Sequence, residues 1–185
     1  DNVIAFEANA NAANEMARNL SVNNLQVQII RKVVSSRNGT VSFGTVSRLA
    51  GNSAVVATSA GQNFRQTSEL ESVTLDAILN EQAEPFAIKI DVEGHEKEVL
   101  AGATRTLSRR CVIQIEDHKG TLELEHFRLL ARIGPDAYFS NIDGIEVARI
   151  FEDACASLIR ANHENKSASL RFGPFGISIH GAPYR

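Results

Sequence analysis

Short apolar runs alternate along this chain with segments whose apolar residues recur every three or four positions. The apolar runs lie at residues 3–6, 27–34, 86–91, 111–116 and 175–181, and the helix-like segments lie at 9–20, 96–107, 121–134 and 152–162. Several runs are apolar throughout rather than at every second position, which is typical of strands buried on both faces of a sheet. The sequence therefore predicts an α/β fold in which helices cover both faces of a mostly parallel sheet.

Turn-forming residues separate the predicted elements. An Asn-Gly pair at 38–39 predicts a turn between two extended runs, and an Asp-Gly pair at 143–144 predicts the tip of a hairpin. Residues 72–81 predict a strand followed by a short helix. Residues 47–70 are rich in small and polar residues without a clear period, so we expect a long excursion or a hairpin there. No repeat or linker divides the chain, and we expect a single domain over residues 1–185.

The composition argues against two classes of partner. With 22% charged residues and a formal net charge of −3, the chain has no basic excess that would attract nucleic acid or an anionic membrane. No apolar run approaches the length of a membrane-spanning helix, which is about 18 residues. The two cysteines, Cys111 and Cys155, do not show the spacing of a disulfide framework or a zinc site. This favours a reducing compartment, and we expect a cytoplasmic protein.

Acidic residues end three of the predicted strands. Glu7 follows the first run, Asp91 ends the run at 86–91, and Glu116 ends the run at 111–116. In an open parallel sheet, ligands bind just beyond the carboxyl ends of the strands, so these carboxylates mark a candidate site. Glu7 either accepts hydrogen bonds from the ribose hydroxyls of a nucleotide or complements the dipole of the next helix. The dinucleotide fingerprint G-x-G-x-x-G does not occur in the sequence.

Acids gather around one glycine in the stretch IKIDVEGHEKEVLAGA, residues 88–103, where a predicted strand gives way to a helix. Gly94 can adopt the positive φ or the close approach that such a turn requires. Glu96 and Glu98 fall in the first helical turn, where the helix dipole favours acids whatever the function. The helix dipole does not account for Asp91, which lies at the strand end.

His118 follows Glu116 in the loop after the run at 111–116. A histidine beside a strand-end acid can act as a general base near neutral pH. Together with Asp91 and Glu93 it could instead ligate a divalent metal, and an exposed loop histidine can also be a bystander. The spacing does not decide among these three roles, and we assign no metal site.

Five segments, taken in order, resemble the FkbM family of S-adenosylmethionine-dependent methyltransferases. They are VIAFEANANAANEMARNLSVNNL, VVSSRNGTVSF, VTLDAIL, IKIDVEGHEKEVLAGA and VIQIE, which together span about residues 1 to 120. The KIDVEGHE segment is quite specific to the family, whereas the likeness beyond residue 120 is weak. The resemblance implies a class I methyltransferase (Rossmann-like) fold, with a sheet of six parallel strands and one reversed strand between two layers of helices.

The resemblance also implies how a cofactor would bind. The cofactor would be S-adenosylmethionine, and Glu7 would accept the hydroxyls of its ribose, with Ala8 in place of the proline usual in the family. Ser35 or Ser36 would lie near the adenine, although an acid is common at the position of Ser36. Asp91 would lie near the methionine end and the methyl acceptor. The acceptors implied are hydroxyl groups of sugars or polyketide-type natural products.

One segment of the family pattern is missing from the sequence. The Asp-x-Gly-x-Asn segment, which forms the family's first strand and its glycine turn, should precede VIAFE but does not occur. A sheet without this central strand would expose two long unpaired edges. We therefore expect an N-terminally incomplete domain, whose first strand and glycine loop lie upstream of these residues.

The expected reaction is methyl transfer to a hydroxyl of a sugar or natural-product small molecule. A hydroxyl is a weak nucleophile, so a base would help. Asp91 or His118 is the candidate base, while Glu93 and Glu116 would orient the acceptor or a cation. The main alternative is a noncatalytic methyltransferase-like module that serves binding or assembly in a larger protein. A nicotinamide-dependent dehydrogenase is a second alternative, because Glu7 would serve there too.

Overall fold

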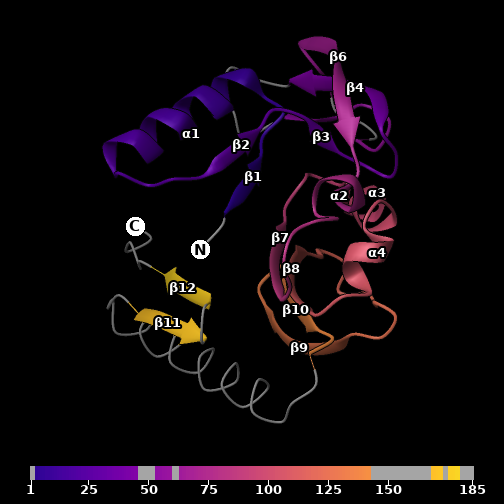
Figure 1. Cartoon of the computed structure of the whole chain (residues 1–185). Helices are drawn as coiled ribbons and strands as arrows, with labels where there is room; N and C mark the ends of the chain where they lie inside the picture. Colours follow the sequence, from indigo (N-terminus) through magenta and orange to yellow (C-terminus); the bar gives the residue numbers. More distant parts are fainter. Residues whose placement is uncertain (1–2, 46–52, 60–62, 143–167, 173–174, 180–185) are drawn as a thin grey trace. The chain divides into compact units, whose positions relative to one another are not determined.

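The computed structural model describes residues 3–45, 53–59, 63–142, 168–172 and 175–179. The chain divides into two compact units, and Figure 1 labels most of their elements. Unit 1 comprises Asp1–Gln82 with Ile90–Ser108, and unit 2 comprises Ala83–Lys89 with Arg109–Arg185. Helices and strands follow one another along the described part of the chain, so the α/β class expected from the sequence is confirmed.

A helix and a two-stranded sheet begin unit 1. Their bounds are β1 (Ile4–Phe6), α1 (Ala10–Val22) and β2 (Gln28–Ile30). The two strands run parallel, and α1 connects them, as Figure 1 shows. Asn9 caps the helix, because its Oδ1 accepts hydrogen bonds from the N–H of Asn11 at 2.9 Å and of Ala12 at 3.2 Å. The helix expected at 9–20 is therefore confirmed.

A second sheet in unit 1 has four strands in the order β3-β6-β4-β5. Their bounds are β3 (Val33–Val34), β4 (Gly39–Thr45), β5 (Ser53–Val55) and β6 (Gln66–Val73). β3 runs parallel to β6, whereas β4 is antiparallel to both β5 and β6. The run expected as one strand at 27–34 is two strands, because its halves, β2 and β3, pair with different partners.

The described part of unit 1 also contains three short helices. They are α2 (Leu75–Ile78), α3 (Glu96–Ala101) and α4 (Thr104–Leu107). The strand and short helix expected at 72–81 are confirmed by the end of β6 and by α2. The helix expected at 96–107 is present, but it breaks at Gly102 into α3 and α4. Among the described helices, none is long and apolar enough to cross a membrane.

The core of unit 1 lies against the second sheet. Val33, Phe43 and Val55 form a buried cluster, and Ala8, Val41 and Leu70 pack against it. Full burial of a side chain such as Val or Phe stabilises the fold by roughly 1.5–3 kcal/mol. Ala8, the residue after Glu7, packs against this cluster, which includes Val33 of β3. The segment that follows β1 is therefore packed against the second sheet.

Unit 2 is built on a sheet with the strand order β7-β8-β10-β9. The bounds are β7 (Phe86–Ile90), β8 (Cys111–Glu116), β9 (Arg128–Ile133) and β10 (Asp136–Ser140). β10 is antiparallel to both of its neighbours. Fully buried residues alternate along β8, and two of them, Ile113 and Ile115, pair with the buried Phe139 and Ala137 of β10. The strands expected at 86–91 and 111–116 are confirmed.

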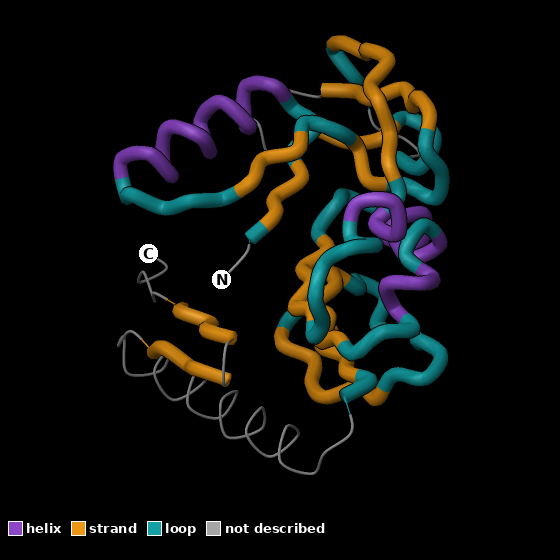
Figure 2. The backbone as a smooth tube through the Cα atoms, in the orientation of Figure 1, coloured by secondary structure: helices purple, strands orange, loops and turns teal. Residues whose placement is uncertain are grey.

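The helix expected at 121–134 is wrong, since this segment is a loop followed by β9 (Figure 2). Gly134, with a φ of 60°, connects β9 to β10 through a tight turn. The apolar residues of the segment recur at helical spacing, but they meet neighbours across the strands of a sheet. A pairing partner of this kind cannot be read from local spacing.

The C-terminal expectations are tested only in part. A strand expected at 175–181 is confirmed as β12 (Phe175–Ile179), which pairs in antiparallel with β11 (Ala168–Phe172). The hairpin tip expected at 143–144 and the helix expected at 152–162 lie outside the described residues.

A mostly parallel sheet is not what the described strand pairs show. Parallel pairing joins β1 to β2 and β3 to β6, whereas antiparallel pairing joins β4 to β5 and β6, β10 to β8 and β9, and β11 to β12. Parallel neighbours need a long crossover connection, while antiparallel neighbours can be joined by a short turn. The turn at 134–135 is a short connection between the antiparallel strands β9 and β10. The apolar pattern of the flanking segments did not indicate it.

Candidate functional site

The acid-rich stretch forms a tight turn between β7 and α3, which we call the acidic turn (residues 91–95). The N–H of His95 donates to the carbonyl of Val92 at 3.3 Å. The two central residues, Glu93 and Gly94, both have positive φ, at 53° and 93°. This is the φ pattern of a type I′ turn, which favours glycine and asparagine. Gly94 therefore has the positive φ that its position suggested, and Glu93 shares it.

The acidic turn presents carboxylates on a strained backbone. A left-handed conformation at a residue other than glycine costs about 1–2 kcal/mol, and such residues cluster at functional sites. Asp91 and Glu93 are both exposed. Glu96, by contrast, stabilises the turn, because its Oε1 accepts a hydrogen bond from the N–H of Gly94 at 3.0 Å. Glu96 thus supports the structure of the turn, while the first two acids lie at its surface.

His95 ends the acidic turn and is 3% exposed. Its Nε2 lies 3.0 Å from the Oγ of Ser35, and its Nδ1 lies 3.0 Å from the Oγ1 of Thr58. Burial lowers the pKa of His95 below its usual value of 6.5, against the opposing effect of Glu98 and Glu96. The ring is therefore neutral at pH 7, where it donates one hydrogen bond and accepts another.

The two serines expected near the adenine have different environments. Ser35 is 3% exposed, and its hydroxyl faces His95. Its backbone N–H donates to the carbonyl of Val73 at 2.9 Å, which continues the pairing of β3 with β6. Ser36 is exposed. Of the two hydroxyls, that of Ser36 is open to a ligand.

Glu7 follows β1, and its N–H donates to the carbonyl of Ile30 at 3.1 Å, so the backbone at Glu7 is held by β2. Its Oε1 accepts a hydrogen bond from the N–H of Asn9 at 2.7 Å. Its Oε2 makes no hydrogen bond to any residue that the structure describes. The Asn9 side chain in turn donates to the Oγ of Ser53 in β5 at 2.9 Å, and Ala8 packs against the core cluster. The carboxylate of Glu7 is thus held from one side.

Glu116 and His118 lie in the loop after β8. The Nε2 of His118 is 3.2 Å from the Oε1 of Glu116, and the His118 side chain is 73% exposed. Asp117 between them accepts hydrogen bonds from the N–H of Leu122 at 2.9 Å and from the Nη1 of Arg132 at 2.7 Å. Burial alone would raise the pKa of Asp117, but these hydrogen bonds and the Arg132 charge outweigh it and lower the pKa. Asp117 therefore anchors the loop that carries the other two.

The predicted site residues divide between the two units. Unit 1 contains Glu7, Ala8, Ser35, Ser36, Asp91 and Glu93, and unit 2 contains Glu116 and His118. Within unit 1, the contacts of His95 join Ser35 to the acidic turn. In the described ranges, no three His, Cys, Asp or Glu side chains come together as a set that could hold a metal ion.

Sequence reasoning missed two side chains with structural importance for this region. Thr58 lies in the 47–70 segment, where no period or motif singles it out, yet it contacts His95. Asp76 lies in the first turn of α2 and was not singled out from the sequence. Its carboxylate accepts hydrogen bonds from the start of α4. Contacts over 29 to 37 residues of sequence leave no local signal.

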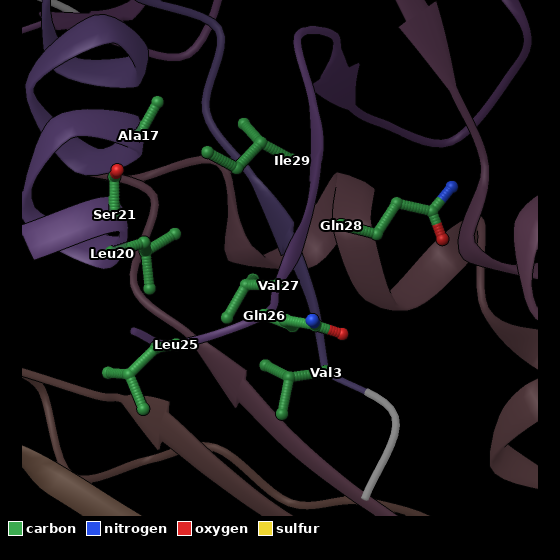
Figure 3. A pocket seen from close by; sticks show the side chains of 9 residues that line it. All are labelled: Val3, Ala17, Leu20, Ser21, Leu25, Gln26, Val27, Gln28 and Ile29. Atoms are coloured by element: carbon green, nitrogen blue, oxygen red, sulfur yellow. The ribbon is translucent and has the colours of Figure 1, made fainter. Parts of the chain in front are cut away.

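A hollow of about 540 Å³ lies in unit 1 between α1 and the β1–β2 sheet (Figure 3). It is lined by Val3, Ala17, Leu20, Ser21, Leu25, Gln26, Val27, Gln28 and Ile29. None of these side chains titrates, and none belongs to the predicted site. Because the hollow has no group that could take a proton, we do not place the chemistry there.

Comparison with known proteins agrees with the sequence motifs. The family model described as the methyltransferase FkbM domain matches residues 1–143, a range that contains every predicted site residue. The chain is also similar to "Hexuronic acid methyltransferase AglP" of Haloferax volcanii, with 31% identity over 130 residues. This match covers 70% of the chain and 53% of the relative, so the chain spans about half the length of that curated protein.

No solved structure matches the chain. The assignment to a family therefore depends on the family model and on the relative, and both cover most of the chain. The resemblance expected from the KIDVEGHE segment and its neighbours is confirmed. The chain belongs to the FkbM methyltransferase family.

Proposed function

We propose that the protein is an S-adenosylmethionine-dependent O-methyltransferase whose acceptor is a hydroxyl group of a sugar. Membership of the family supports methyl transfer, and the name of the Haloferax relative supports a sugar, a hexuronic acid, as the class of acceptor. The observation that carries the proposal is the acidic turn, where Asp91 and Glu93 are exposed and Glu93 has a left-handed backbone. Carboxylates accept hydrogen bonds, and sugar hydroxyls donate them.

The residues of unit 1 fit the chemistry of the cofactor. The ribose offers two hydroxyl donors, and Glu7 offers a carboxylate of which one oxygen is fixed by the N–H of Asn9. We propose that the carboxylate of Glu7 binds the ribose and that the backbone of Ala8 lies beside it. We assign the adenine to the segment after β3, where Ser36 is exposed and Ser35 supports it from the buried side.

S-adenosylmethionine, when bound, supplies a methyl group that is activated by the positive charge on sulfur. The protein must orient the acceptor oxygen and remove its proton. Asp91 is the first candidate base, because it directly follows β7 and its backbone is therefore placed by the sheet. Glu93 would hold the acceptor by accepting hydrogen bonds from it.

His118 is the second candidate base. Its Nε2 faces the Glu116 carboxylate at 3.2 Å. If Nε2–H donates to that carboxylate, Nδ1 is left as the proton acceptor of the neutral ring. Glu116 would then orient the imidazole.

We propose further that a class I methyltransferase fold is completed by a glycine-bearing strand beside those described. Among the described strands, β1 pairs only with β2, and β7 pairs only with β8. Each of these two strands therefore lies at the edge of its described sheet. Open strand edges of this kind accept a further strand. A glycine turn after such a strand would let the backbone approach the cofactor closely. The reversed strand β10 agrees with the one reversed strand of the class I sheet.

Calorimetry and a methyl-transfer assay on the full-length protein test the proposed function. The protein is titrated with S-adenosylhomocysteine and with NAD, and is then incubated with S-adenosylmethionine and hexuronic acid glycosides. We expect binding of S-adenosylhomocysteine and methylation of a sugar hydroxyl. Asp91→Asn should lower turnover by about 100-fold or more, since general-base catalysis contributes about 10²–10⁴-fold. Glu71→Gln, which removes an exposed carboxylate in β6, is the control and should leave turnover unchanged.

Other results would contradict parts of the proposal. Binding of NAD without S-adenosylhomocysteine would favour a dehydrogenase. Binding of S-adenosylhomocysteine without transfer to any sugar hydroxyl would favour a noncatalytic module. If Asp91→Asn and His118→Ala both kept the wild-type turnover, the assignment of the base would be wrong.

A further inference from the structure

His95 makes contacts that methyl transfer does not explain. It is the N-cap residue of α3, yet its side chain does not cap the helix. Its ring is buried and lies 3.0 Å from each of two hydroxyl groups, those of Ser35 and Thr58. The three residues come from three different connections, after β7, after β3 and after β5. One ring therefore constrains three connecting segments of unit 1 together.

Two glycines show how closely the same segments pack. A Cβ added to Gly94 would lie 3.6 Å from the carbonyl oxygen of Thr58, so the acidic turn lies against the Thr58 segment. A Cβ added to Gly102, at the end of α3, would overlap the carbonyl oxygen of Ser35. The ring of His95 thus lies where these segments already touch, and its two hydrogen bonds fix their relative positions.

The pair of Ser35 and His95 is not arranged for nucleophilic catalysis, although an imidazole beside a serine can activate the hydroxyl. Ser35 is 3% exposed, so its Oγ cannot meet a substrate. The Nδ1 of the ring faces Thr58, and the carboxylate of Glu98 lies 3.8 Å away, beyond hydrogen-bond distance. Both ring nitrogens are already used for contacts inside the fold.

We propose that His95 is a positioning residue, which sets the acidic turn relative to the Ser35–Ser36 segment through its contacts with Ser35 and Thr58. This inference rests on the proposed function, in which the turn faces the methyl acceptor and the segment faces the adenine. Transfer between two bound molecules tolerates little displacement, since a misplacement of about 1 Å can cost about 100-fold in rate. Loss of either contact would then change catalysis without removing a group that touches the reacting atoms.

Side-chain amides separate the two contacts of the ring, because each has one acceptor and one donor group. The amide of His95→Gln reaches about as far as Nε2 and can keep the contact with Ser35. The shorter amide of His95→Asn takes the place of Nδ1 and can keep the contact with Thr58. Thr58→Val and Ser35→Ala remove the partner hydroxyls one at a time. Ser140→Ala is the matched control, since Ser140 is also 3% exposed and hydrogen-bonded but lies in unit 2.

The effects should separate in kinetics and in cofactor-product affinity, both measured on the full-length protein. We expect Thr58→Val and His95→Gln to lower kcat by about ten-fold or more, because the acidic turn is then released. The Kd of S-adenosylhomocysteine should change by less than about three-fold in these variants. Ser35→Ala and His95→Asn should raise that Kd by about five-fold, because the adenine segment loses its preorganisation. Ser140→Ala should leave both quantities unchanged.

A uniform result would overturn the proposal. If every variant changed kcat and Kd only in proportion to the folded fraction in thermal unfolding, the role of His95 would be merely structural. NMR of the ligand-free protein gives a second test, in which Thr58→Val should shift the amide signals of both the acidic turn and the Ser35–Ser36 segment. Shifts that do not extend to the Ser35–Ser36 segment would also overturn it. If the wild-type protein bound no S-adenosylhomocysteine, the proposed function would fail, and the NMR result would decide the role of His95.

Discussion

Asp76 accepts two hydrogen bonds from Thr106, one from its backbone N–H at 2.7 Å and one from its Oγ1 at 2.8 Å. The other carboxylate oxygen accepts hydrogen bonds from the N–H of Arg105 at 3.0 Å and from the Oγ1 of Thr104 at 3.2 Å. A residue in the first turn of α2 therefore satisfies the N–H groups at the start of α4, which have no partner within their own helix. The two helices are held together by one carboxylate.

Replacing Asp76 by Ala should lower the free energy of unfolding by about 1–3 kcal/mol, because two backbone donors of α4 lose their partner. Urea unfolding of both proteins measures the change. Glu71→Gln is the control, since Glu71 forms an exposed ion pair with Lys32 at 2.8 Å and should cost less than about 1 kcal/mol. Equal losses in the two variants would contradict the capping role.

Asp76 should also make the stability of unit 1 sensitive to acid. Burial alone would raise the pKa of its carboxyl, but hydrogen bonds from Arg105, Thr106 and Thr104 outweigh that effect and lower the pKa below 3.8. The unfolded chain then takes up a proton first, so this contribution is complete above pH 3.8 and is lost as the pH falls below it. Asp76→Asn should flatten the stability profile in this window, as urea titrations between about pH 5 and pH 2.5 would show. An unchanged slope would contradict the assignment.

His95 should make the stability of unit 1 depend on pH in a less acidic range than Asp76 does. Its pKa is lowered by burial, with Glu98 and Glu96 opposing, while the groups that face it from other segments are the neutral hydroxyls of Ser35 and Thr58. Since the folded state resists protonation, stability should be complete above pH 6.5 and should fall as the pH drops below it. His95→Gln should remove this slope, because an amide does not titrate. Thermal unfolding at several pH values checks it, and a slope that persisted in the variant would belong to another group.

Two variants of Glu93 distinguish the effect of its strained backbone from the effect of its charge. Glu93→Asn replaces the carboxylate by an amide on a shorter side chain. It also lowers the backbone strain, because asparagine tolerates a φ of 53° better than glutamate does. Glu93→Gln removes only the charge. We expect both variants to lose methyl transfer, while the Asn variant is more stable than the Gln variant by about 0.5–1 kcal/mol. Wild-type turnover in both variants would exclude Glu93 from acceptor binding.

Gly102 should be intolerant of any side chain for a steric reason. A Cβ there would overlap the carbonyl oxygen of Ser35, so Gly102→Ala must displace either α3 or the segment after β3. We expect a loss of about 2 kcal/mol or more in the free energy of unfolding. Gly120→Ala is the contrasting variant, since its φ is 65° but nothing lies within 4 Å of an added Cβ, and backbone strain alone should cost about 1–2 kcal/mol. A smaller loss at Gly102 than at Gly120 would contradict the close contact.

Local patterns predicted the elements whose interactions are themselves local. The spacing of apolar residues in α1 and the mostly apolar sequence of β8 both involve residues within a few positions of one another. The acidic turn was equally visible, because a glycine among acids marks a strand-to-helix junction. The same stretch carried the family resemblance, which the family model confirms over residues 1–143.

Local sequence patterns were thus sufficient to predict the α/β class, the acidic turn and the family. Three further features depend on long-range contacts: residues 128–133 form a strand, Asp76 caps α4, and His95 contacts Ser35 and Thr58. The physical reason is the same in each case. The strand, the carboxylate of Asp76 and the imidazole of His95 all form hydrogen bonds with partners that are distant in the sequence. Local spacing of residues does not indicate which distant residues will be the partners.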